Sequence, residues 1–188
     1  MNNCFILSFY LPSKESATIL GEMLSTIDNN FKNVTIYVGF NPSDFISDGI
    51  EVMNKYSNLN IVYDVVKPTL FTDSDASGFQ LALKLLKESN KMFDIYWFMH
   101  SKAITTNRHI EREFMINDFI THKNKIYKLF KGDNNIGSYG DMMLQLGTLE
   151  KSHRFTVPTL SGNYLDKFYD FPIKTPLEFF YAKTFYVI

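Results

Sequence analysis

Four short apolar runs, separated by segments with helical spacing of apolar residues, constrain this chain more than any other feature. The runs are Cys4–Leu11, Val34–Phe40, Ile61–Val66 and Phe93–Met99. Each has the length of a strand and is almost continuously apolar, which is typical of strands covered on both faces. The intervening helical patterns cover 13–30, 46–53 and 79–88. This alternation predicts an α/β fold in three layers, with helices flanking a mostly parallel sheet.

The rest of the chain follows the pattern less regularly. We expect a helix over Ile110–Phe130 with a break near Thr121, a short strand over Ile136–Tyr139, and a last strand over Phe179–Ile188. A length of 188 residues, 45% of them apolar, suits a single domain. Since no repeat or linker interrupts the sequence, we predict one domain over residues 1–188.

Composition excludes several classes of protein. The formal net charge is −1, whereas a nucleic-acid binder normally needs a basic excess, so no nucleic-acid partner is expected. The single cysteine, Cys4, lies in an apolar run and is expected to be a buried small hydrophobe. No run approaches the roughly 20 apolar residues of a membrane span. Met1–Tyr10 lacks the basic start and cleavage site of a signal peptide, so we expect a cytoplasmic location without a membrane span.

The loop over Thr69–Ser77 holds one group of candidate functional residues. Ligands of open α/β sheets bind beyond the carboxyl ends of the strands, and this loop follows the third predicted strand. Asp73 and Asp75 place two carboxylates there. They are suited to hold a ribose hydroxyl or a divalent cation that bridges phosphates. The alternative is that they cap the helix that follows.

A second group, His100, Ser101 and Lys102, directly follows the fourth predicted strand. Lys102 can neutralise a diphosphate as a point charge. His100 can donate a hydrogen bond, or act as an acid or base near neutral pH. The alternative is an ordinary loop with a satisfied histidine and an exposed lysine.

The stretch from Phe93 to Met143 resembles the rhamnan-synthesis F family of cell-wall and capsule glycosyltransferases. The matching features are a strand leading into a His-x-Lys motif, an arginine-containing helix, a Leu-Phe helix and a short Ile-Gly strand. They correspond here to Met99–Lys102, Arg108 and Arg112, Ile126–Phe130, and Asn135–Gly137. The final segment, Phe179–Ile188, also resembles that family. The first half resembles the Rossmann-like nucleotide-binding half of type-A glycosyltransferases, with Ser77–Ala82 at the glycine-containing helix start.

The resemblance implies transfer of a sugar from a nucleotide-diphosphate donor to a glycan or polysaccharide acceptor, by a protein shortened at its C-terminus. His100 and Lys102 would stabilise the leaving diphosphate. Six residues are expected to bind the donor: Ser8, Tyr10, Asp73, Asp75, Gly78 and Ser101. In type-A enzymes an Asp-x-Asp follows the fourth strand, but here that place holds His100–Lys102. Two alternatives follow: Mn²⁺ or Mg²⁺ is held by Asp73 and Asp75, or the reaction is metal-independent.

Two other functions stay open at the level of sequence. One is a binding module that keeps the glycosyltransferase fold without catalysis. The other is an unrelated nucleotide-binding α/β protein, which should bind a mononucleotide as well as a nucleotide sugar.

Overall fold

The computed structural model of the chain describes residues 1–67, 75–101, 109–132, 139–140, 143–145, 180–182 and 186–187. The chain divides into two compact units. The first consists of Met1–Tyr139 with Thr184–Ile188, and the second of Gly140–Lys183. In the second unit, β6 (Met143–Gln145) and β7 (Phe180–Ala182) form an antiparallel pair.

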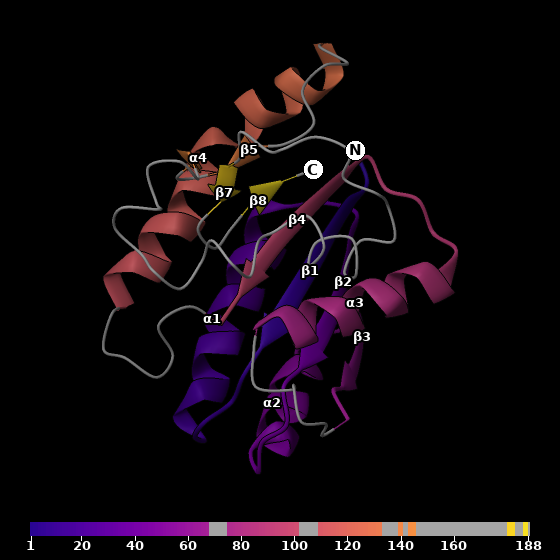
Figure 1. The fold of residues 1–188 in the computed structure, drawn as a ribbon, viewed down its shortest axis with the longest axis vertical. Helices are drawn as coiled ribbons and strands as arrows, with labels where there is room; N and C mark the ends of the chain where they lie inside the picture. Colours follow the sequence, from indigo (N-terminus) through magenta and orange to yellow (C-terminus); the bar gives the residue numbers. More distant parts are fainter. Residues whose placement is uncertain are drawn as a thin grey trace. The chain divides into compact units, whose positions relative to one another are not determined.

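The main sheet has the strand order β3-β2-β1-β4-β8-β5 (Figure 1). Its strands are β1 (Asn3–Phe9), β2 (Val34–Phe40), β3 (Asn60–Val65), β4 (Ile95–His100), β5 (Tyr139–Gly140) and β8 (Tyr186–Val187). β1 pairs in parallel with both β2 and β4, and β2 pairs in parallel with β3. β8 is antiparallel to β4. The predicted α/β class with a parallel sheet is therefore confirmed, and the parallel part is compatible with a Rossmann-like fold.

Helices cover both faces of the parallel strands (Figure 1). They are α1 (Glu15–Asn30), α2 (Ile46–Met53), α3 (Asp75–Ser89) and α4 (His109–Gly132). On one face the sheet packs against α1, α2 and α4, for example through Leu20, Met53 and Phe119. On the other face Cys4 and Ile6 pack against α3, which contributes Ala82 to a second buried cluster. Chain order and strand order together place the reversal of the strand sequence at β1, between β2 and β4.

Trp97 of β4 anchors α4 to the sheet. Its ring is fully buried and stacks on Phe5 of β1, with centroids 5.7 Å apart. Two α4 rings meet it edge-on: Phe119 at 5.5 Å and Tyr127 at 6.2 Å. Aromatic contacts of this kind add to the free energy gained from apolar burial, so α4 is a fixed part of the first unit.

Some predicted element boundaries were wrong. α3 begins at Asp75, inside the stretch predicted as a loop. Polar residues can form the first turn of a helix, so the spacing of apolar residues did not reveal this start. The break predicted near Thr121 is absent, since α4 is continuous from His109 to Gly132. Thr121 is exposed, so its polar side chain is compatible with the middle of this helix. The last predicted strand is two strands, β7 and β8, which belong to different sheets. No helix in the described part of the chain has both the length and the apolar character needed to cross a membrane.

Candidate functional site

The carboxyl ends of β2, β1 and β4 form an edge that we call the carboxyl edge; its last strand residues are Phe40, Phe9 and His100. Near this edge Ser8 stands in register with Gly39 on one side and His100 on the other. Side chains alternate along a strand, so Ser8 faces α3 as Cys4 and Ile6 do. His100 faces the same helix, since its ring lies 6.3 Å from that of Phe79.

Two glycines bring the first turn of α3 against this edge. A Cβ atom on Gly39 would lie 1.9 Å from the carbonyl oxygen of Gly78. A Cβ atom on Gly78 would lie 2.2 Å from Ser8 Oγ and 2.8 Å from the carbonyl oxygen of Gly39. No side chain fits at those distances, so the absence of Cβ atoms is what permits this approach. The N-terminal end of α3, where the helix dipole favours negative charge, therefore begins beside Ser8.

Ser101 ties the segment after β1 to the end of β4. Its backbone N–H donates to the carbonyl oxygen of Ser8 over 3.1 Å, and its Oγ accepts a hydrogen bond of 3.0 Å from the backbone N–H of Tyr10. Ser101 is buried, whereas Tyr10 is 37% exposed. The phenol of Tyr10 is therefore held on a fixed backbone at the point where the strand order reverses, and this is where open α/β sheets bind ligands.

Two buried oxygen atoms at the carboxyl edge lack hydrogen-bond partners among the described residues. They are Ser8 Oγ and Asn41 Oδ1. Ser8 is fully buried and Asn41 is 6% exposed. Asn41 directly follows β2 and donates its backbone N–H to the carbonyl oxygen of Phe9, which places it beside β1. An unpartnered buried polar atom costs about 1–3 kcal/mol, so each requires an explanation.

The buried polar side chains at the opposite, amino-terminal edge of the sheet are fully paired by comparison. Asn3 Oδ1 accepts hydrogen bonds from Trp97 Nε1 (3.0 Å) and from the Tyr127 hydroxyl (2.9 Å). Thr35 Oγ1 accepts one from Asn60 Nδ2 (3.2 Å). These buried polar side chains are thus satisfied within the protein, whereas Ser8 Oγ and Asn41 Oδ1 at the carboxyl edge have no partner among the described residues.

The structure brings together five of the eight residues that the sequence singled out: Ser8, Tyr10, Gly78, His100 and Ser101. Asp73 and Lys102 lie outside the described residues. Asp75 is the first residue of α3, and its side chain is likewise outside the description. Within the described residues, no three or more His, Cys, Asp or Glu side chains gather into a metal-binding group.

Two residues of this edge were not among the predicted site residues. Gly39 and Asn41 flank the end of β2, inside and just after a strand that was correctly predicted. A glycine in an apolar strand often signals a close backbone approach, which could have identified Gly39. Asn41 precedes a proline, so in the sequence it resembled a simple turn residue. That its Oδ1 lacks a partner becomes evident only in three dimensions.

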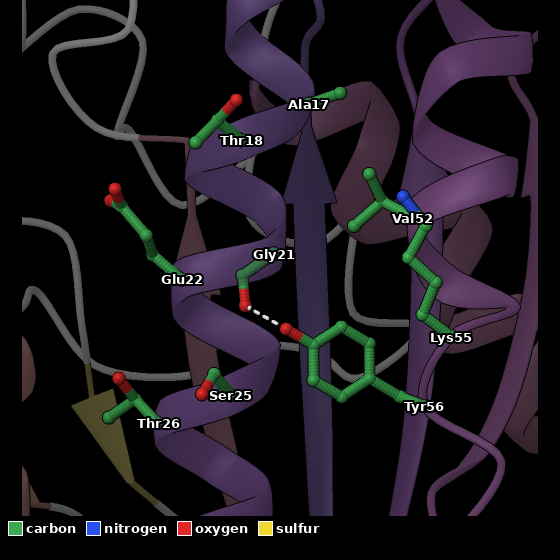
Figure 2. A pocket seen from close by; sticks show the side chains of 9 residues that line it. All are labelled: Ala17, Thr18, Gly21, Glu22, Ser25, Thr26, Val52, Lys55 and Tyr56. Atoms are coloured by element: carbon green, nitrogen blue, oxygen red, sulfur yellow. Dashed lines mark hydrogen bonds between the residues drawn. The ribbon is translucent and has the colours of Figure 1, made fainter.

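A separate hollow of about 570 Å³ lies between α1 and α2, away from these residues. Figure 2 shows that Gly21 and Tyr56 face each other across it, and the Tyr56 hydroxyl donates a 2.7 Å hydrogen bond to the carbonyl oxygen of Gly21. Its lining contains none of the residues that the sequence singled out. The candidate site is therefore the carboxyl edge.

No protein-family model matches this chain, and no curated protein matches it in sequence.

Proposed function

We propose that this chain is a glycosyltransferase with a type-A-like fold, which binds a nucleotide-diphosphate sugar at the carboxyl edge and transfers the sugar to a glycan or polysaccharide acceptor. One observation carries the proposal: Ser8 Oγ and Asn41 Oδ1 are buried without partners where the strand order reverses. A nucleotide offers the hydroxyl, N–H and phosphate groups that such atoms require.

Each residue of the edge has a chemical task in this proposal. The Ser8 hydroxyl donates to a ribose or phosphate oxygen beside the N-terminal end of α3. Asn41 Oδ1 accepts a hydrogen bond from a base or ribose. The exposed ring of Tyr10 offers a surface on which a base can stack. The Ser101 hydroxyl accepts the hydrogen bond from the backbone N–H of Tyr10 and so holds Tyr10 in place.

The transfer step needs stabilisation of the leaving group above all. The bond between the anomeric carbon and the diphosphate oxygen breaks, and its electron pair goes to the diphosphate. The acceptor oxygen bonds to the anomeric carbon, and its proton passes to solvent. His100, at the end of β4, and Lys102, two positions further along the chain, supply the positive character that stabilises the diphosphate.

The metal requirement is part of the same proposal. Asp73 and Asp75 precede and open α3, so a Mn²⁺ or Mg²⁺ ion held there would neutralise the diphosphate at the same helix end. If His100 and Lys102 neutralise it instead, no ion is needed. Manganese dependence of donor binding decides between the two.

A thermal-shift panel tests the donor site. UDP-, GDP-, dTDP- and CDP-sugars, each with and without manganese, are compared with the corresponding mononucleotides. A ligand that binds only the native state raises Tm by mass action. We expect one nucleotide class to raise Tm, and its sugar-bearing form to raise it more than the mononucleotide. An equal shift with the mononucleotide would instead indicate an unrelated nucleotide-binding protein.

Turnover of the donor found in this way tests transfer itself. We expect release of the nucleoside diphosphate, and we expect Lys102→Ala to slow it by roughly 100-fold or more, which is typical for loss of one group that stabilises developing charge. Tm without ligand should be unchanged in this variant. Donor binding with no turnover in the wild type would point to a module that has kept the fold and lost catalysis.

A further inference from the structure

The second half of α4 carries a row of lysines on its outer side. Phe119 and Ile126 of this helix are buried against the sheet, whereas Lys125, Lys128 and Lys131 are exposed. Their spacing of three residues places them on successive turns of one side of the helix. We call these three residues the lysine row.

No acidic residue accompanies the lysine row along its own helix segment. Residues 119–132 contain four lysines and no Asp or Glu, so their formal charge is +4. Subtracting it from the net charge of −1 leaves −5 for the rest of the chain. This half-helix, which lies between Asp118 and Asp133 in the sequence, is thus net positive, whereas the rest of the chain is net negative.

Three lysines outside α4, namely Lys14, Lys55 and Lys84, form ion pairs. Lys123, the fourth lysine of the segment, donates its Nζ hydrogen bond to the carbonyl oxygen of Asn30, and Nζ lies 5.2 Å from the centroid of the Phe31 ring. In α3, Lys84 Nζ lies 3.8 Å from Glu88 Oε1. Among the described residues, none of the ion pairs includes a member of the lysine row.

We propose that the lysine row docks this protein on a membrane surface of anionic lipid headgroups. Lysine ammonium groups are point charges, which suits a surface of many phosphates better than a single oriented ligand. A row on one side of a helix can reach a flat surface with all its members at once. Nucleic acid is the poorer fit, because three lysines on an acidic protein fall short of the phosphate contacts that such binding requires.

Co-sedimentation with lipid vesicles tests this inference. The full chain is mixed with vesicles of phosphatidylcholine alone, or with about one third phosphatidylglycerol, at low and high salt. The test variant is Lys125→Gln, Lys128→Gln, Lys131→Gln. The matched control, Lys84→Gln, Lys87→Gln, Lys91→Gln, removes the same charge from α3 and its following turn, where Glu88 is present. Unchanged Tm values verify that both variants fold.

We expect the wild type and the α3 variant to bind only the anionic vesicles, and high salt to release them. The α4 variant should bind roughly 100-fold more weakly, as expected from the attraction of three surface lysines to an anionic leaflet. An equal loss in both variants, binding that salt does not weaken, or no binding by the wild type would overturn the inference. So would lysine-dependent binding to an RNA oligonucleotide without vesicle binding.

Discussion

Asn3 is a buried residue whose side chain joins several elements at the amino-terminal edge of the sheet. Its Oδ1 accepts hydrogen bonds from Trp97 and Tyr127, and its Nδ2 donates to the carbonyl oxygens of Met1 and Lys32. We expect Asn3→Ala to lower the free energy of unfolding by about 2–4 kcal/mol, because it leaves the buried Trp97 N–H and the half-buried Tyr127 hydroxyl without their acceptor. Urea denaturation measures this loss.

Tyr127→Phe and Asn58→Ala are the comparisons for that variant. Tyr127→Phe removes one of the two donors and should cost about 1 kcal/mol. Asn58 is exposed, so Asn58→Ala should change stability by less than about 0.5 kcal/mol. Equal effects of Asn3→Ala and Asn58→Ala would contradict the role given to Asn3.

Cys4 is predicted to be unreactive in the native protein. Burial raises the pKa of its thiol to about 12, so the thiolate that reacts with disulfide reagents is scarce. A thiol reagent should modify Cys4 only after denaturation, at a rate set by unfolding. Modification of the native protein as fast as of the unfolded chain would show that the thiol is accessible.

The same pKa shift predicts how stability depends on pH. Above the ordinary thiol pKa of 9.0 the unfolded chain loses the thiol proton, while the native protein retains it up to about pH 12. The free energy of unfolding therefore falls as pH rises through this window. Below pH 9 the thiol is protonated in both states, so the stability is not reduced there. Cys4→Ala should reduce the decline in stability above pH 9 relative to the wild type.

At the scale of single residues, burial was easier to predict than hydrogen bonding. Cys4 was expected to be buried because of its apolar neighbours, and it is. Asn41 could not be recognised, because sequence does not say whether an amide oxygen meets a donor. The residues of the candidate site that were predicted all lie on, or directly after, strands whose ends the apolar runs located, or at the start of α3.

At the scale of elements, the contact between α3 and the strand ends can be tested with two helical glycines. In Gly78→Ala the new Cβ overlaps Ser8 and the Gly39 backbone. In Gly21→Ala the new Cβ meets two side-chain ends, Val52 Cγ1 at 3.3 Å and the Tyr56 hydroxyl at 3.8 Å. Both variants gain about 1 kcal/mol of helix propensity. At Gly78 we expect the steric overlap of the new Cβ to exceed this gain, so that the free energy of unfolding falls by about 1–3 kcal/mol.

Thermal or urea denaturation of the two variants provides the comparison. We expect Gly78→Ala to be clearly less stable than Gly21→Ala. If the two variants were equally stable, α3 would not approach the strands as closely as the structure indicates.

Elements with a strong apolar period were predictable, whereas those held by long-range pairing were not. The four parallel strands were placed within a few residues because each contains a mostly apolar run. α3 starts earlier than predicted, since Asp75–Gly78 carries no apolar signal in the sequence. The separation of β7 from β8 depends on which strands they pair with, and that information is not local.

At the scale of the whole first unit, the site follows from topology. A chain that crosses to β2 and β3 over one face and returns to β4 over the other must leave a crevice at β1. The alternation of apolar runs and helices predicted the parallel strands, but not their order. The order is what places Ser8 and His100 side by side.

The central claim is that the unpartnered atoms of the carboxyl edge serve a ligand, and Ser8→Ala tests it most directly. The matched control is Thr35→Val, which removes a buried hydroxyl that has a partner at the opposite edge. For each variant, Tm is measured without ligand and with the nucleotide sugar that shifts the wild type. We expect Ser8→Ala to be at least as stable as the wild type but to lose most of the ligand-induced shift. Thr35→Val should be less stable and keep the shift. A destabilised Ser8→Ala that retains the full ligand-induced shift would contradict the claim.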